Sequence, residues 1–203
     1  MLETLIPTLT ALVGVLGTLG TIWFKHKLKE RNKEKEVCPV GKCVNEDVEL
    51  LNKLNEILGD INADRVSIYS FHNGGEFYSG KPMQKMSMSY EVVSSGIARR
   101  QIQRQSIPVS ACASTLQTLM EKRMWNHPNV KDYPESLCKS YLMEDGVKST
   151  YQWAIIDLNR RAVGMLRVDY IKRMNKLSDK ELNKITLNVI KMSGYLNGSQ
   201  QIK

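Results

Sequence analysis

The sequence lacks the short motifs by which many enzyme families are identified. It has no phosphate-binding loop, no dinucleotide fingerprint, no Gly-x-Ser-x-Gly nucleophile turn and no His-Glu-x-x-His helix. The one set that could support acid–base chemistry is His72 with Glu76 and Glu91, near the end of an expected strand. Because His72 can instead hydrogen-bond the turn at Asn73-Gly74, we predict that the protein is not an enzyme.

Cysteine is scarce, and its spacing does not indicate a metal site. Of the four cysteines, Cys38 and Cys43 flank four residues, whereas Cys112 and Cys138 stand alone. Zinc sites use more closely paired ligands. We predict no metal, no cofactor and four reduced thiols in a cytoplasmic domain. A Cys38–Cys43 disulfide is the alternative if the domain faces the periplasm.

Acidic residues are outnumbered, and the net charge is +8. The densest basic block is residues 25–36, with six Lys or Arg and three Glu. A second cluster, Arg99, Arg100 and Arg104, lacks the aromatic residues on which nucleic-acid bases stack. We therefore expect no nucleic-acid partner.

A long uncharged run begins the chain. Residues 4–24 contain no charged side chain over 21 positions. As a helix this run reaches about 31 Å, which matches a hydrocarbon core of about 30 Å. A cleaved signal peptide is the alternative, but the basic leader and the small-residue cleavage site are missing. We predict a transmembrane anchor over residues 1–24.

A basic juxtamembrane linker, residues 25–46, follows the anchor. Because the Lys and Arg excess lies on this side of the span, the positive-inside rule predicts a single-pass protein of the inner (cytoplasmic) membrane with a cytoplasmic domain. Pro39 and Gly41 predict a helix break at residues 38–43. The residues expected at the membrane surface, where anionic head groups attract them, are Lys25, Lys27, Lys29 and Arg31.

Small residues recur along the anchor at helical spacing. They could form a face for close contact between membrane helices, which predicts a homo-oligomer. Glycine is also simply common in membrane helices, and both interpretations stay open. The residues of this face are Ala11, Gly14, Gly17 and Gly20.

Residues 47–203 have the pattern of one soluble α+β domain. Apolar spacing predicts a first helix that ends at Gly59, and a Ser178/Glu181 capping box opens the last helix. Strands are expected at residues 65–71, 86–93, 150–157 and 162–171, the last two as a hairpin. We also expect a turn at residues 73–75, a short helix within residues 111–124 and a loop with one helical turn at residues 133–146. This order predicts an antiparallel sheet flanked by helices.

Three segments are similar to a GAF domain over about residues 47–197. They are Val66-Ser-Ile-Tyr-Ser-Phe71, Arg161-Ala-Val-Gly-Met-Leu-Arg167 and Leu177-Ser-Asp-Lys-Glu-Leu182. The resemblance implies a GAF/PAS-like fold with a small molecule between the sheet and the loops that cross it. The alternative is that the aromatic side chains pack the core and close the pocket. The pocket residues that the resemblance implies are Phe71, His72, Asn73, Tyr78, Tyr90 and Glu91.

A narrower resemblance is to small phage membrane proteins, including T-even phage holins. It rests on one membrane helix followed by a strand like Ile68-Tyr-Ser-Phe71, with Tyr90-Glu91 downstream and a similar last hairpin and helix. In that holin family the soluble domain faces the periplasm. We therefore expect a membrane-anchored, non-enzymatic, phage-encoded GAF-like sensory or interaction protein with a small-molecule or protein ligand. A holin-type lysis protein that forms membrane lesions, and a virion or membrane-assembly component, are the alternatives.

Overall fold

The computed structural model describes residues 39–77 and 79–198. The chain divides into two units, Met1–Asn45 and Glu46–Lys203, and the second is the one treated below. Within the described ranges, no helix is long and apolar enough to cross a membrane. The predicted anchor, its small-residue face and the basic residues 25–36 lie outside the described residues, so they stay predictions.

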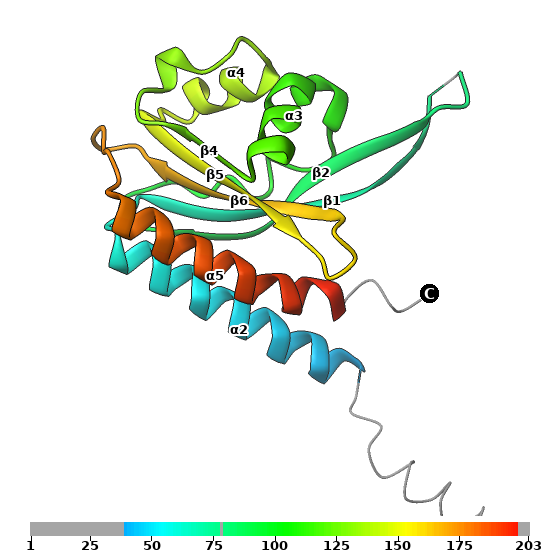
Figure 1. The fold of residues 1–203 in the computed structure, drawn as a ribbon, viewed down its shortest axis with the longest axis horizontal. Coiled ribbons are helices and arrows are strands. Elements are labelled where there is room, and N and C mark those ends of the chain that lie inside the picture. Colours follow the sequence, from blue (N-terminus) through cyan, green and yellow to red (C-terminus); the bar gives the residue numbers. More distant parts are fainter. Residues whose placement is uncertain (1–38, 78, 199–203) are drawn as a thin grey trace, which may run out of the picture. The chain divides into compact units, whose positions relative to one another are not determined.

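An antiparallel sheet of six strands forms the centre of the domain, in the order β3-β2-β1-β6-β5-β4 (Figure 1). β1 and β2 form the longest hairpin, but β1 pairs with β6 only from Arg65 to Ser70. The far half of this hairpin therefore extends beyond the rest of the sheet. The strands are β1 (Arg65–Glu76), β2 (Pro82–Val93), β3 (Ile107–Pro108), β4 (Met124–His127), β5 (Ser149–Ile156) and β6 (Ala162–Tyr170).

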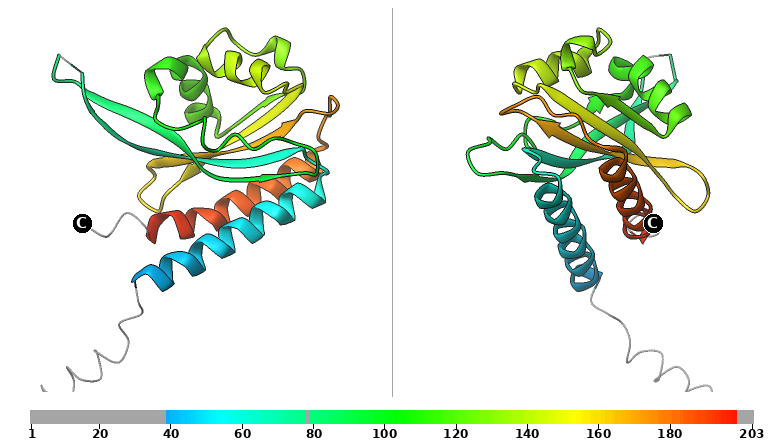
Figure 2. Two further views of the ribbon diagram at one scale, coloured as in Figure 1. Left: turned by 180° about the vertical axis from the view of Figure 1, so that it is seen from behind. Right: turned by 60° about the vertical axis from the view of Figure 1, so that its left-hand side comes forward.

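Helices cover both faces of the sheet, which confirms the predicted α+β fold. Two long helices, α2 (Pro39–Asp60) and α5 (Asp179–Gly198), lie side by side against one face (Figures 1 and 2). The short helices α3 (Ala113–Lys122) and α4 (Leu137–Glu144) cover the other face. The 3₁₀ turns η1 (Val109–Cys112) and η2 (Val130–Asp132) lead into this second layer.

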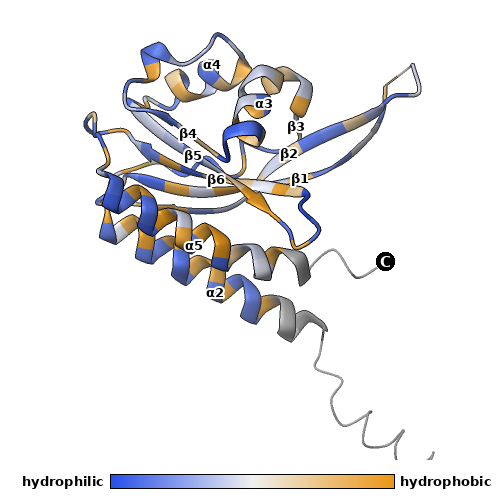
Figure 3. Ribbon diagram, in the orientation of Figure 1, coloured by the Kyte–Doolittle hydropathy of each residue, from blue (hydrophilic) through white to orange (hydrophobic). Residues whose placement is uncertain are grey.

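The two long helices form from the pattern that the sequence predicted. Leu50, Leu54 and Ile57 recur at helical spacing and are each at most 1% exposed. Figure 3 shows the apolar stripes of α2 and α5 turned toward the sheet. The capping box is confirmed, since Ser178 N donates to Glu181 Oε2 at 2.7 Å and Glu181 N donates to Ser178 Oγ at 3.4 Å.

Two predicted boundaries are wrong. The break expected at residues 38–43 is absent, because α2 begins at Pro39 and continues through Gly41. Proline is tolerated at the first helical position, where the amide has no intrahelical acceptor. The turn expected at residues 73–75 lies later, where Phe77 N donates to Lys81 O at 2.9 Å. The glycines belong instead to an irregularity in the hairpin, with Gly75 at a φ of 90°.

Candidate ligand-binding site

A small cavity lies beneath α3 and α4, on the face of the sheet opposite to α2 and α5. Its volume is about 10 Å³, which is room for one water molecule at most. The lining consists of Tyr69, Met86, Ile107, Thr115, Leu116, Tyr133, Cys138, Tyr141, Leu142, Gln152, Met165 and Arg167.

Two side chains of this lining, Tyr69 and Arg167, have donors without a hydrogen-bond partner among the described residues. These donors are Tyr69 Oη and Arg167 Nη2, on side chains that are 1% and 5% exposed. The buried hydroxyl of Thr115, which can both donate and accept, is a third group of the lining without a partner. The Arg167 guanidinium carbon lies 4.9 Å from the centre of the Tyr69 ring, a cation–π distance. Burial raises the pKa of Tyr69 to about 12, so its hydroxyl keeps its proton at neutral pH. Unpaired buried donors are rare and costly, which marks this cavity as a candidate site.

The backbone of β1 and β6 brings these two donors together. Ser67 pairs with Arg167, and Tyr69 pairs with Met165, in the antiparallel register of the two strands. Gly164 allows the strands to approach closely, because a Cβ atom there would overlap the carbonyl oxygen of Tyr69. The glycine of the Val-Gly-Met-Leu segment thus permits the strand pairing that brings Tyr69 and Arg167 to the same cavity.

Gln152 and Tyr133, two other polar residues of the lining, are bonded to each other. Gln152 Nε2 donates to Tyr133 Oη at 3.1 Å. The Tyr133 ring also contacts Trp125 and His127, with ring centres 5.6 and 4.5 Å apart. Burial raises the pKa of Tyr133, and the nearby side chains of Gln152 and Thr115 oppose this rise more weakly. Tyr133 is therefore an uncharged part of the cavity lining, held in place by these contacts.

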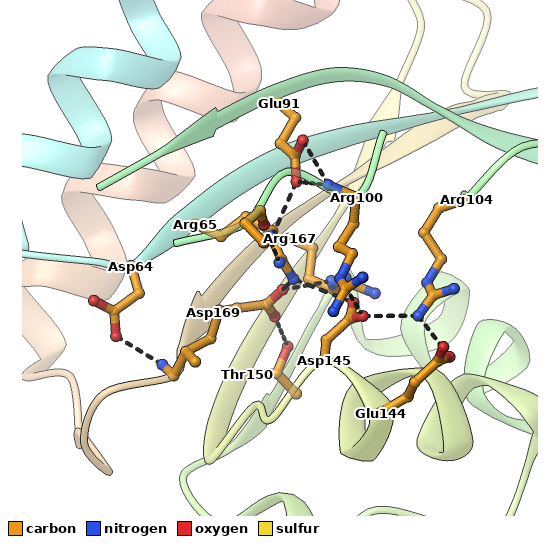
Figure 4. Close-up of polar contacts among 12 residues, drawn as sticks. Asp64, Arg65, Glu91, Arg100, Arg104, Glu144, Asp145, Thr150, Arg167 and Asp169 are labelled. Carbon is orange, nitrogen blue, oxygen red and sulfur yellow. Dashed lines mark hydrogen bonds and ion pairs between the residues drawn. The ribbon is translucent and has the colours of Figure 1, made fainter. Parts of the chain in front are cut away.

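A buried network of charges adjoins the cavity at Arg167 (Figure 4). Arg167 Nε donates to Asp169 Oδ2 at 3.1 Å. Thr150 Oγ1 donates to the other oxygen of Asp169 at 2.8 Å. Arg65 Nη1 lies 3.7 Å from Asp169 Oδ2, so Arg167 shares its carboxylate partner with a second arginine.

Asp145, the residue that follows α4, connects the helical layer to this network. Its fully buried carboxylate accepts from Arg65 Nη1 at 3.2 Å and from Arg104 Nη2 at 2.7 Å, and it lies 3.0 Å from Arg100 Nε. Glu91 attaches the loop that contains Arg100 and Arg104 to the sheet. It accepts from Arg100 N at 2.9 Å and pairs with Arg65 Nε at 3.0 Å. Charged hydrogen bonds therefore fix α4 and residues 99–104 on the sheet.

A disulfide joins the two segments above the cavity. Cys112, at the end of η1, is bonded to Cys138, in the first turn of α4, with Cα atoms 5.7 Å apart. The expectation of four reduced thiols is wrong for this pair. The two cysteines are 26 positions apart, and only the packing of η1 against α4 brings them within bonding range.

The structure does not gather the predicted pocket residues into one site, and none of those described lines the cavity. Phe71 is partly buried, and the exposed His72 contacts Asn73 O at 3.2 Å and Ser87 Oγ at 2.8 Å. Tyr90 donates to Asp47 Oδ1 at 2.5 Å on the α2 side of the sheet, whereas Glu91 belongs to the charged network. Tyr78 lies outside the described residues. Ligand binding by this set stays a prediction.

A larger surface groove at the end of α2 is a weaker candidate. Its volume is about 510 Å³, but its charged side chains bind other groups of the domain. Asp64 Oδ2 accepts from Ile171 N at 2.7 Å, and Lys172 Nζ donates to Ser95 O at 2.8 Å. No group of three metal-ligating side chains occurs in the described part of the chain.

One feature of the sequence indicated charged residues of the candidate site that were not predicted. Arg167 and Asp169 alternate with apolar residues inside a strand that is buried throughout. Charged residues in such a strand are rarely buried unless they are paired. Arg167 and Asp169 pair with each other, but Arg65, the second arginine beside Asp169, belongs to a distant strand and could not be identified from a local pattern.

Comparison with known proteins places the fold and leaves the function open. No protein-family model and no curated protein matches the chain. Among solved structures, a far-red cyanobacteriochrome photoreceptor has a TM-score of 0.63 at 12% identity, over 89% of this chain and 99% of that chain. The PixJ GAF domain of Thermosynechococcus elongatus has a TM-score of 0.62 at 12% identity, over 79% and 89% of the two chains. A phycoerythrobilin-bound GAF domain of a cyanobacterial phytochrome has a TM-score of 0.58 at 15% identity, over 78% and 89%. The domain therefore has a GAF-like fold.

Proposed function

We propose that the protein is a membrane-anchored, non-enzymatic sensory module whose GAF-like domain binds a small ligand beneath α3 and α4. The uncharged run at residues 4–24 and the basic residues after it support the anchor. The small-residue face of that run supports assembly into a homo-oligomer. The phage origin rests on the resemblance of residues 68–71 and the single membrane helix.

The cavity with unpaired donors is the observation that carries the ligand-binding proposal. A buried polar group without a partner costs about 1 to 3 kcal/mol. Tyr69 Oη and Arg167 Nη2, which have no partner among the described residues, both face this cost beside the cavity. A ligand that accepts from them would remove it, so binding and local stability would be coupled.

The size of the cavity limits what the ligand can be. The solved GAF domain of a cyanobacterial phytochrome holds phycoerythrobilin. A molecule of that size does not fit a volume of about 10 Å³. The cysteine that lines the cavity, Cys138, is also held in a disulfide, so it has no free thiol. We therefore propose a much smaller, non-covalent ligand.

The lining also supports a role without catalysis. The described cavity residues include no histidine, no carboxylate and no free thiol. Histidine, carboxylate and thiol groups supply much of the known general acid–base and nucleophilic catalysis. Tyr133 and Gln152, two polar residues of the lining, bond to each other.

The proposal is tested by identifying what the purified full-length chain retains. Native mass spectrometry after incubation with cell extract should show one bound small molecule. Arg167→Gln should lose that adduct, whereas Lys172→Gln, in the surface groove, should keep it. A full-length protein that stays free of adducts, or an adduct that survives Arg167→Gln, would contradict ligand binding in this cavity.

A holin-type lysis protein is the second candidate, and the disulfide favours it. Structural disulfides are rare in the cytoplasm and common in the periplasm. The Cys112–Cys138 bond thus supports a domain outside the cytoplasm, as in the holin family, whereas the basic residues 25–36 support a cytoplasmic domain.

Thiol labelling in intact cells separates these two topologies. A membrane-impermeant maleimide should not reach Cys38 and Cys43 if the domain is cytoplasmic, and should label them if it is periplasmic. For lysis, expression should abruptly collapse the membrane potential, and continued potential would exclude the holin function. A neighbouring endolysin gene would support lysis, and neighbouring structural genes would support an assembly role.

A further inference from the structure

We infer that the β5–β6 turn (Asp157–Arg161) and the second half of α5 bind an anionic membrane surface, as a second contact of the protein with the bilayer. This inference rests on the membrane anchor proposed above and goes beyond it, because it assigns a surface of the folded domain to the lipid head groups. The exposure, the charge and the place of these residues in the fold support it.

The β5–β6 turn exposes one apolar and one basic side chain. Leu158 is 91% exposed. Asp157 is buried instead, and its carboxylate accepts from Arg161 N at 2.7 Å and from Arg161 Nε at 2.8 Å. Arg160 is exposed and forms no ion pair with a described residue. The turn therefore combines a leucine with a positive charge that no carboxylate in the described part of the chain neutralises.

An apolar groove continues from this turn along α5. It has a volume of about 250 Å³, and Ile156, the last residue of β5, lines it together with Ile190. On the helix, Ile190 is 64% exposed and Leu187 is 61% exposed. The second half of α5 has Lys191 as its one charged residue. The turn and the helix thus form one surface that is apolar and basic, which is the composition of segments that lie on anionic membranes.

Two arginines at this surface have backbone conformations that favour glycine. Arg160, in the turn, has a φ of 61°, and Arg123, which lines the groove, has a φ of 65°. A side chain in this left-handed region strains the backbone. Both side chains are exposed, so the packing of the domain does not account for arginine at these positions. Strained residues cluster at functional sites, and a guanidinium group binds two phosphate oxygens at once.

The place of this surface in the fold favours the membrane as its partner. α2 and α5 run antiparallel (Figures 1 and 2), and Lys184 Nζ, in the first half of α5, lies 2.7 Å from Asp60 Oδ2 at the end of α2. The second half of α5 is therefore at the end of the helix pair where the chain enters the domain. Because the predicted anchor precedes α2 in the sequence, we expect this end to be the one closer to the bilayer. Within the helix pair, the acidic residues at this end, Glu46, Asp47 and Glu49, belong to α2, so anionic lipid is attracted to the α5 side.

Similar residues at the opposite end of the helix pair provide a matched control. Arg173 is exposed and Met174 is 60% exposed, but they precede α5, and Arg173 lines a groove with Gly59. Residue type alone therefore does not identify a membrane surface. A tether raises the effective concentration of the nearer end at the head groups, so a few basic and apolar side chains suffice for binding there.

Photo-crosslinking of the full-length protein in lipid nanodiscs tests this inference. The discs hold one copy each and contain phosphatidylcholine with phosphatidylglycerol, and the probe is phosphatidylglycerol that carries a diazirine on its head group. Mass spectrometry should find at least fivefold more lipid adducts on residues 157–161 than on residues 172–176. In discs of phosphatidylcholine alone, with the diazirine on that lipid, adducts at the turn should fall at least threefold.

The double variant Leu158→Ser/Arg160→Gln should lower the adducts at the turn at least threefold. Arg173→Gln/Met174→Ser makes matched changes at the opposite end and should leave the adducts at the turn unchanged. All four side chains are exposed, so both variants should keep the thermal midpoint of the wild-type protein.

Adducts at the turn that do not exceed those on residues 172–176, or that are equal for the two lipids, would overturn the inference. So would adducts that Leu158→Ser/Arg160→Gln leaves unaltered. Adducts that disappear in discs with two copies would assign the surface to a second copy of the chain instead. Adducts on residues 4–24 score the anchor separately. If they form without adducts at the turn, the anchor stands and the second contact is wrong, whereas the reverse result would reject the anchor and keep the lipid contact.

Discussion

The two faces of the sheet differ in whether their buried polar side-chain atoms have hydrogen-bond partners. Under α2 and α5, the buried aromatic side chains all direct their polar atoms to partners: Tyr170 Oη donates to Ile61 O at 2.9 Å, Tyr151 Oη to Asn175 O at 2.8 Å, and Trp153 Nε1 to Thr186 Oγ1 at 3.0 Å. Under α3 and α4, Tyr69 Oη has no partner. The first face is built as a stable core, and the second keeps unpaired groups around a cavity.

The faces also differ in how their helices are attached. Apolar contact from residues such as Leu54 and Val189 holds α2 and α5. The smaller helices α3 and α4 are held in addition by the Cys112–Cys138 disulfide and by the carboxylate of Asp145. Specific polar and covalent contacts thus fix the layer over the cavity, where apolar burial alone is limited. This difference can be tested one attachment at a time.

The largest loss of stability is expected from Asp145→Asn. Removing this charge leaves Arg65 and Arg104 buried without full compensation, and breaking a buried pair in this way costs about 3 to 5 kcal/mol. Glu144→Gln is the matched control, because Glu144 contacts the same Arg104 but its side chain is 60% exposed. In urea denaturation, the control should lose less than about 1 kcal/mol of its free energy of unfolding. Equal losses in the two variants would show that the network does not hold α4.

Leu54→Ala tests the opposite face. Leu54 is fully buried, and truncating such a leucine costs about 2 to 5 kcal/mol. The loss should appear in the free energy of unfolding, while the small molecule retained from cell extract should still be bound. Leu187→Ala, at an exposed position of α5, should change stability by less than about 0.5 kcal/mol. A folded Leu54→Ala protein that no longer retains this molecule would show that the faces are not independent.

Reduction of the disulfide should lower stability by about 2 to 4 kcal/mol. Without the bond, α3 and α4 should become accessible to limited proteolysis before α2 and α5 do. The Cys112→Ser/Cys138→Ser double variant serves as the control, since reductant should not change its midpoint. Cleavage that begins in α2 or α5 would contradict a disulfide that acts on the cavity layer.

The smallest changes in stability are expected when one of two buried tyrosine hydroxyls is removed. Tyr170→Phe removes a bond to Ile61 O and leaves that carbonyl unpaired, which should cost about 0.5 to 1.5 kcal/mol. Tyr69→Phe removes a hydroxyl without a partner among the described residues, so in the absence of ligand it should be neutral or stabilising. Calorimetry of both variants checks the order. A larger loss for Tyr69→Phe would show that its hydroxyl is bonded in the protein.

The sequence predicted the elements whose pattern is local. The α2 stripe, the capping box at Ser178 and the hairpin of β5 and β6 are all confirmed, because each depends on residues a few positions apart. The short strands β3 and β4 were missed, since two and four residues are too few for a periodic pattern. The candidate site was missed for a different reason. Tyr69 and Arg167 come together through strand pairing over about a hundred positions, and no local period records that distance.

Hydrogen exchange of the full-length protein, with and without the small molecule retained from cell extract, tests most directly whether the α3 and α4 face is the ligand face. The bound molecule should slow exchange in η1, α3 and α4 and in the parts of β1 and β6 beside the cavity, and it should leave α2 and α5 unchanged. Tyr69→Phe should abolish this protection. Protection that appears mainly in α2 and α5, or that persists unchanged in Tyr69→Phe, would contradict the assignment of the two faces.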